Sequence, residues 1–241
     1  MAYINSIRTR IQASWAAPLA AALLALPAMA QATPIGISGA GDLGSFVGTF
    51  DYGFDGTFGT VTVVLDNTSA PVANGGFITS FAFNLPTPTG VSWTGAVLTD
   101  DDPDFDFELI GGPTFANTVN GAPYGRFDIG ASTGNGFEGG GNPNDGISIA
   151  NAPVTFTFTL SGTGLGGLDA DAFLSTFSVG PGDGQGVQPF VVRFKGFTEG
   201  FGSDDEEGSD KVPIDAVPEP GSLLLLASGA AALLARRRRA A

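Results

Sequence analysis

The sequence predicts an all-β protein: an antiparallel β-sandwich of the jelly-roll or immunoglobulin-like type with at most one short helix, and an apolar helix near each end of the chain. Several segments alternate apolar and polar residues with the two-residue period of a half-buried strand. The 37 Gly and 16 Pro residues supply turns between these segments. All 20 Phe residues lie between Phe46 and Phe201, so the middle of the chain holds a core of its own.

Composition removes whole classes of chemistry. The 241 residues include no His and no Cys, which excludes an imidazole base, a thiolate nucleophile, a Cys/His zinc site and a disulfide. The formal net charge of −14 excludes nucleic acid as an ordinary partner, because binding it requires a basic face. Residues 33–216 hold four basic and 23 acidic side chains, a net charge of −19. That charge favours divalent cations, basic surfaces or neutral polysaccharide as partners.

Residues 1–32 have the three parts of a secretory signal peptide in the required order. Arg8 and Arg10 precede an apolar run over 15–26, which forms the signal helix and is too short to span a bilayer. Small residues follow at the spacing that a signal peptidase reads, namely Ala28, Ala30 and Ala32. The expected partners of this end are therefore the export machinery and signal peptidase.

Residues 33–197 are expected to form the β-sandwich. The clearest alternation covers 154–160, where Val154, Phe156, Phe158 and Leu160 share one face and three Thr residues share the other. Further strands are expected at 60–65, 77–85, 91–97, 105–109, 126–129 and 190–194. One wet face on each strand is typical of an antiparallel sandwich.

One short helix is expected over 168–177. Asp169 and Asp171 lie near its start, where the helix dipole favours negative charge. Phe173 and Phe177 are four residues apart and are expected to face the core together. The Phe residues as a group are interpreted as core, because an exported domain without Cys depends on apolar burial for its stability.

An acidic segment after residue 99 is a candidate calcium site, because Ca²⁺ prefers several oxygen ligands. Its alternating carboxylates are Asp100, Asp102, Asp104, Asp106 and Glu108. An EF-hand is excluded, because a loop that starts at Asp102 would place Phe107 where Gly is required and Pro113 where Glu is required. The alternative is an acidic sheet edge that resists aggregation.

Residues 198–216 are interpreted as a solvated linker of acidic and Gly/Ser residues that keeps the domain clear of the tail.

Residues 217–241 form a three-part tail. Val217, Pro218, Glu219 and Pro220 form a short polar motif, an apolar helix follows over 221–235, and Arg236, Arg237, Arg238 and Arg239 end the tail. The helix is marginal as a membrane span, and the arginines are expected to stop on the cytoplasmic side. The prolines fix φ and remove two N–H donors, so the motif favours an extended strand that a protease binds readily.

This tail resembles the PEP-CTERM sorting signal of Gram-negative bacteria. The resemblance implies processing by a membrane enzyme of the exosortase type, with Pro218-Glu219-Pro220 as the recognition element and with the nucleophile on the enzyme. It also implies an association with exopolysaccharide and biofilm. The alternative for the tail is an ordinary membrane anchor that is never processed.

The sequence thus indicates an exported, non-enzymatic surface or matrix protein without catalytic residues. It is expected to be anchored transiently in the membrane by its C-terminal helix and then to be extracellular or on the cell surface. Two alternatives stay open. One is a calcium-dependent carbohydrate-binding or adhesion module, and the other is a polysaccharide-active enzyme that uses Asp and Glu.

Overall fold

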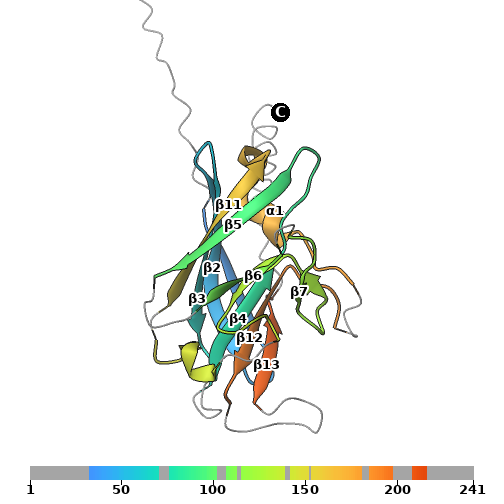
Figure 1. The fold of residues 1–241 in the computed structure, drawn as a ribbon. Helices are drawn as coiled ribbons and strands as arrows, with labels where there is room; N and C mark the ends of the chain where they lie inside the picture. Colours follow the sequence, from blue (N-terminus) through green and yellow to red (C-terminus); the bar gives the residue numbers. More distant parts are fainter. Residues whose placement is uncertain are drawn as a thin grey trace, which may run out of the picture. The chain divides into compact units, whose positions relative to one another are not determined.

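The computed structural model describes residues 33–70, 76–101, 107–112, 115–138, 142–151, 153–180, 185–197 and 208–215. The chain divides into two compact units, Met1–Ala30 and Gln31–Ala241, and all described residues belong to the second. This unit is an antiparallel β-sandwich (Figure 1), which confirms the predicted fold class.

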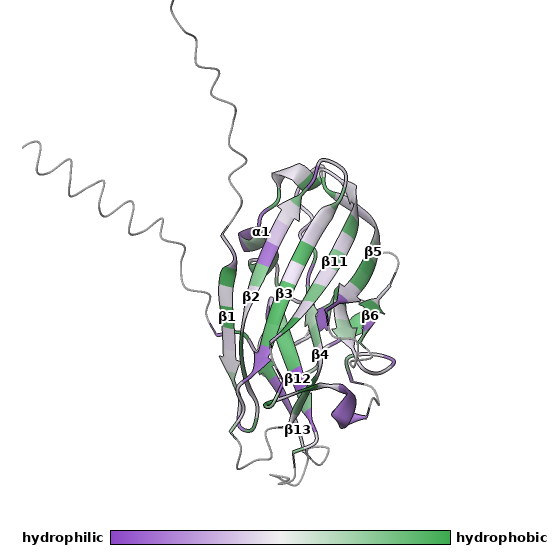
Figure 2. Cartoon of the chain, turned by 90° about the vertical axis from the view of Figure 1, so that its left-hand side faces the viewer, coloured by the Kyte–Doolittle hydropathy of each residue, from purple (hydrophilic) through white to green (hydrophobic). Residues whose placement is uncertain are grey.

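A five-stranded sheet forms one layer of the sandwich. Its strands, in spatial order, are β1 (Ile35–Ala40), β2 (Ser45–Phe54), β3 (Gly59–Asn67), β11 (Val154–Thr163) and β5 (Ser92–Asp100). Figure 2 shows this sheet face-on, with hydrophobic and hydrophilic residues alternating along its strands. On β11 the apolar residues are buried and the intervening Thr residues are half-exposed, as the two-residue period predicts.

A six-stranded sheet forms the other layer. Its main path is β13 (Ser209–Pro213), β12 (Phe190–Lys195), β4 (Phe77–Phe83), β9 (Ile129–Ser132) and β6 (Glu108–Gly111), and β10 (Ile147–Ser148) also pairs with β4. A separate hairpin joins β7 (Val119–Asn120) to β8 (Arg126–Phe127). The described helices are short: α1 (Ala170–Leu174), η2 (Pro143–Asp145) and η3 (Leu165–Gly167).

Phenylalanine rings fill the space between the sheets. Phe83 of β4 lies with its ring centroid 5.5 Å from that of Phe50 on β2 and 5.1 Å from that of Phe158 on β11. Phe173 and Phe190 also contact Phe83, at 6.4 Å each. Since all five side chains are fully buried, these contacts confirm the core interpretation for this part of the Phe set.

The outer face of the six-stranded sheet is buried as well. Val191 on β12 and Ala82 on β4 point away from the main core and join a second apolar cluster with Phe127, Phe137 and Ile110. The β7–β8 hairpin and the loop before residue 139 supply much of this cover. Residues on both faces of β4 are therefore buried, although a sandwich strand usually has one wet face.

The predicted linker is wrong for residues 209–213, which form strand β13. Val212 is fully buried, and the Asp210 carboxylate accepts the backbone N–H groups of Leu43 and Gly44 at 2.9 Å each. An acidic residue is thus used here as a hydrogen-bond acceptor inside the fold, which composition alone does not reveal. Residues 198–207 lie outside the described part of the chain.

The predicted helix is shorter than expected. Asp169 caps α1 by accepting the N–H of Ala172 at 2.9 Å, and the helix ends at Leu174. Phe173 faces the core as predicted, whereas Phe177 lies beyond the helix and is 52% exposed. The four-residue spacing places two side chains on one face only while the helix continues.

Candidate functional site

The site residues of the predicted signal peptide and of the predicted sorting tail lie outside the described ranges. These are Val217, Pro218, Glu219 and Pro220, the arginines Arg236 to Arg239, and Ala28, Ala30 and Ala32 at the expected signal cleavage site. Within the described ranges, no helix is long and apolar enough to span a membrane.

The structure describes two of the five candidate calcium ligands. Asp100 ends β5 and is half-buried, and Glu108 starts β6 and is exposed, while Asp102, Asp104 and Asp106 fall outside the described residues. The next residue after Asp100, Asp101, accepts the N–H of Thr155 on β11 at 2.9 Å, so this carboxylate already forms a hydrogen bond within the sheet. The described residues contain no cluster of three or more His, Cys, Asp or Glu side chains.

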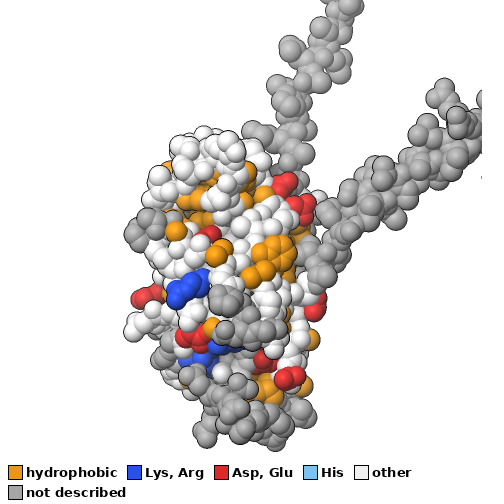
Figure 3. Space-filling model, turned by 90° about the vertical axis from the view of Figure 1, so that its right-hand side faces the viewer, with side chains coloured by type: hydrophobic (Ala, Val, Ile, Leu, Met, Phe, Trp, Pro, Cys, Tyr) orange, Lys and Arg blue, Asp and Glu red, His pale blue; other side chains and the backbone are white. Residues whose placement is uncertain are grey.

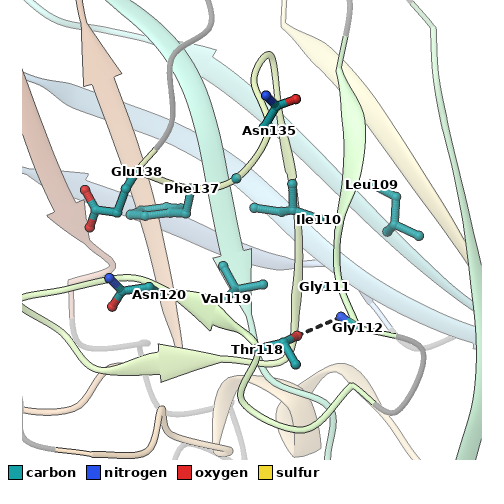
Figure 4. Close-up of a pocket in the computed structure, with 11 residues that line it drawn as sticks. Leu109, Ile110, Gly111, Gly112, Thr118, Val119, Asn120, Asn135, Phe137 and Glu138 are labelled. Carbon is teal, nitrogen blue, oxygen red and sulfur yellow. Dashed lines mark hydrogen bonds between the residues drawn. The ribbon is translucent and has the colours of Figure 1, made fainter.

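A cavity of about 600 Å³ lies on the outer side of the six-stranded sheet (Figure 4). Ile110, Val119 and Phe137 form its apolar wall, and Asn120 and Glu138 lie at one side. These three side chains are buried and belong to the second apolar cluster described above. The cavity thus combines an apolar wall with a few polar groups, which is usual for ligand pockets.

Local backbone chemistry shapes this cavity. The Gly112 N–H donates to Oγ1 of Thr118 at 2.7 Å (Figure 4), which ties the end of β6 to the start of β7. Gly111 has a φ of +127°, and a Cβ there would approach the Asp128 carbonyl oxygen to 2.5 Å. Only glycine therefore allows β6 and the start of β9 to lie so close at this point.

Glu138, the acidic residue at this cavity, lies close to two basic side chains of the six-stranded sheet. Lys211 on β13 places its Nζ 2.8 Å from Oε1 of Glu138, and the same Nζ donates to the Ala122 carbonyl oxygen at 2.6 Å. Arg193 on β12, 1% exposed, donates to the Phe137 carbonyl oxygen at 2.9 Å and lies 3.7 Å from Oε2 of Glu138. Figure 3 shows one face of the domain, on which basic side chains lie beside acidic ones.

Sequence reasoning did not identify this charged cluster. A signal was present: Arg193 interrupts the apolar run over 190–194, and a buried cation requires a partner. The partner, Glu138, is distant in sequence and could not be selected from 23 acidic residues in the exported part.

A second cavity, of about 400 Å³, is organised by Asp128. Asp128 lies between β8 and β9, and its two oxygens accept the N–H groups of Asn117 at 2.7 Å and Leu85 at 2.9 Å. One carboxylate thus holds together two loops of the cavity wall. Burial raises the pKa of Asp128, and these two hydrogen bonds oppose that shift without cancelling it.

The raised pKa of Asp128 predicts a pH-dependent loss of stability. A carboxyl group whose pKa is higher in the folded state binds its proton more tightly there. Its contribution to the free energy of unfolding is therefore complete below its pKa in the unfolded chain, near 4, and declines as pH rises through its pKa in the folded state. We expect the Asp128→Asn variant to lack this decline. The melting temperature of wild type minus that of the variant should therefore fall as pH rises from 4 to 7. A rise of this signed difference over the same range would contradict the prediction.

The hydrogen-bonded part of the domain extends to Asp215, the last residue that the structure describes. The Asp215 N–H donates to the Ser38 carbonyl oxygen at 2.7 Å, and the Ser38 hydroxyl donates to Oδ2 of Asp215 at 3.2 Å. The Ile214 N–H donates to the Phe190 carbonyl oxygen at 3.2 Å. The two Asp215 bonds attach the C-terminal end of the domain to β1, and the Ile214 bond attaches it to β12.

A family model for the PEP-CTERM protein-sorting motif matches residues 216–239. Searches of curated proteins and of solved structures found no match. The family match confirms the resemblance that the tail residues indicated. A motif of this kind implies export and processing by an exosortase-type enzyme at the membrane.

Proposed function

We propose that this chain is an exported, non-enzymatic protein of the cell surface or extracellular matrix, and that its domain associates with exopolysaccharide after an exosortase-type enzyme has processed the tail. The observation that carries this proposal is the sorting-motif match at residues 216–239, directly behind the folded domain. The expected signal peptide at residues 1–32 supplies the other requirement for export.

The position of the domain end supports processing close to the fold. Asp215 is hydrogen-bonded to β1, and Val217 begins the predicted recognition segment two residues later. Two residues of extended chain span at most about 7 Å. An enzyme that binds Val217 to Pro220 therefore works beside the edge of the domain formed by β13, and the expected spacer does not separate them.

The non-enzymatic part of the proposal is supported by the content of the two cavities. Among the described residues, the lining of the first cavity includes one carboxylate, Glu138, which is paired with Lys211, and the lining of the second includes one, Asp128. Glycoside hydrolysis usually needs two carboxyl groups on opposite sides of a glycosidic bond, roughly 5 to 10 Å apart. The chain has no His or Cys to replace the missing group.

The acidic character of the mature chain supports a place away from the membrane once the tail is cut. A net charge of −19 over residues 33–216 is repelled by anionic lipid and opposes self-association. A neutral polysaccharide carries no charge to be repelled. Processing is therefore expected to release the domain into the polymer layer.

Intact mass spectrometry of the protein from cells and from culture medium tests the proposal. We expect secreted material to lack the signal peptide and the residues behind the Val217–Pro220 motif, and to co-fractionate with exopolysaccharide. The control is the same strain without its exosortase, in which the tail should remain attached. Secreted protein that still ends in Arg236 to Ala241 would refute the sorting role. Correctly processed protein that does not co-fractionate with the polymer would refute the association.

A further inference from the structure

We propose that the Asp128 cavity is a sugar-binding site that takes one glycosyl unit of a neutral polysaccharide. The cavity lies where the β4–β5 loop, the loop before β7 and the segment after α1 meet. The residues that carry the argument are Asn84, Trp93, Asn117, Asp128, Phe177 and Val179, all of which line it. This inference rests on the proposed association with exopolysaccharide and specifies the part of the domain that makes it.

The polar side of the cavity presents acceptors. Nδ2 of Asn84 donates to the Thr176 carbonyl oxygen at 3.2 Å, while its Oδ1 is buried and accepts no hydrogen bond. Asn84 is only 1% exposed, so this acceptor has also lost its contact with bulk water. A buried acceptor without a donor is unfavourable, and a ligand hydroxyl that reaches it would relieve that cost.

Asp128 supplies the second acceptor. Each of its oxygens accepts one backbone N–H, and a carboxylate oxygen has a further lone-pair direction available. Hydrogen bonds to an ionised acceptor are stronger than those to a neutral one. The cavity therefore favours ligands rich in O–H donors.

The apolar side of the cavity presents aromatic and aliphatic surface. Nε1 of Trp93 donates to the Pro86 carbonyl oxygen at 3.0 Å, and the Trp93 ring lies 6.1 Å from that of Phe173, so the indole is held in place. Phe177 and Val179 are 52% and 54% exposed, and both line this cavity, so they add accessible apolar surface to it. The face of a sugar ring that carries C–H groups packs well on surfaces of this kind.

The charge of the lining selects against anions. The described residues that line the cavity include neither Lys nor Arg, and Asp128 would repel a phosphate or a carboxylate. A neutral sugar ring offers both hydroxyl donors and an apolar face, so it matches the two sides of the cavity at once. The volume of about 400 Å³ lies within the usual range for small-ligand sites.

The described part of the loop that contributes Asn117, residues 115–118, has a defined backbone conformation without a ligand. Phe115 and Asn117 have φ values of 44° and 54°, in the left-handed region that residues other than Gly seldom adopt. The bond from the Asn117 N–H to Asp128 holds this conformation. A site that is already ordered loses less conformational entropy when it binds.

The fluorescence of Trp93 can report on binding at this site. It has two Trp residues, Trp15 in the expected signal peptide and Trp93 in the cavity wall. In full-length protein with Trp15→Phe, all tryptophan emission comes from Trp93. We would titrate this protein with glucose, galactose, mannose, cello-oligosaccharides and dextran, and with alginate and choline chloride for comparison.

We expect a saturable change in Trp93 emission with at least one neutral sugar, and none with alginate or choline. Phe177→Ala should weaken binding about tenfold, since it removes one exposed aromatic surface from the site. Phe58→Ala is the matched control, because Phe58 is also exposed, at 41%, and does not line the cavity. Its affinity should equal that of the parent protein.

Saturable binding of choline or alginate without a neutral sugar would overturn the inference. The absence of a saturable change with every sugar, or equal weakening by Phe177→Ala and Phe58→Ala, would also overturn it. These results are independent of tail processing. A correctly processed protein that binds no sugar refutes the cavity assignment alone, and a sugar-binding protein with an intact tail refutes the sorting proposal alone.

Discussion

Replacing Pro218 and Pro220 together by Ala is expected to stop processing of the tail. Proline fixes φ and biases the residue before it towards extended backbone, so the pair prepares Glu219 for the binding site of a processing enzyme. Alanine favours helix instead and would allow the apolar helix to extend towards the domain. The expected result is at least a tenfold drop in the processed fraction, measured by intact mass on protein from cells and medium.

Two comparisons make this result specific. Pro34→Ala changes an exposed proline directly before β1, outside the sorting motif, and should leave processing of the tail unchanged. Glu219→Gln keeps the size and the flanking prolines but removes the charge, so it separates recognition of the carboxylate from recognition of the backbone. Processing of the double proline variant at the normal rate would show that the enzyme does not read this segment.

Truncating Phe83 is expected to cause the largest loss of stability of any single change considered for the domain. The Phe83 ring contacts rings from both sheets and from α1, and its side chain is fully buried. Phe83→Ala should cost about 3 to 5 kcal/mol, because the cavity it leaves has rigid aromatic walls. For a domain of this size, that corresponds to a fall in melting temperature of roughly 6 to 20 °C.

Thermal unfolding followed by circular dichroism measures this effect. Phe58→Ala, at an exposed position, is the control and should cost less than about 1 kcal/mol. Phe83→Leu restores part of the apolar volume and should lie between the two. If Phe83→Ala and Phe58→Ala destabilised the domain equally, the ring cluster would not be the main source of stability.

The sequence alone determined the features that depend on local pattern. The two-residue alternation of 154–160 predicted β11, because alternate side chains of a strand point to opposite faces wherever its partners lie. The tail could be identified in the same way, since an enzyme that binds an extended segment reads consecutive residues. The absence of His and Cys also needed no structure.

Strands at the ends of the domain were harder to predict. Half of the residues of β1 are Gly or Ser, Gly48 and Gly53 dilute the apolar pattern of β2, and β13 follows directly on an acidic run. The register of β13 on β12 gives Val212 its burial and Asp210 its acceptor role. Neither follows from residues near them in the chain.

Only the tertiary structure decided which polar groups meet. Lys211 reaches Glu138, and Asp128 joins the loops of Leu85 and Asn117, although the members of each set are far apart in the sequence. Many acidic residues could have filled either role, and local periodicity does not distinguish among them. The choice depends on strand pairing and on which loops the two sheets bring together. A linear motif in the tail therefore revealed how the protein is sorted, whereas the candidate ligand site became visible only in the folded domain.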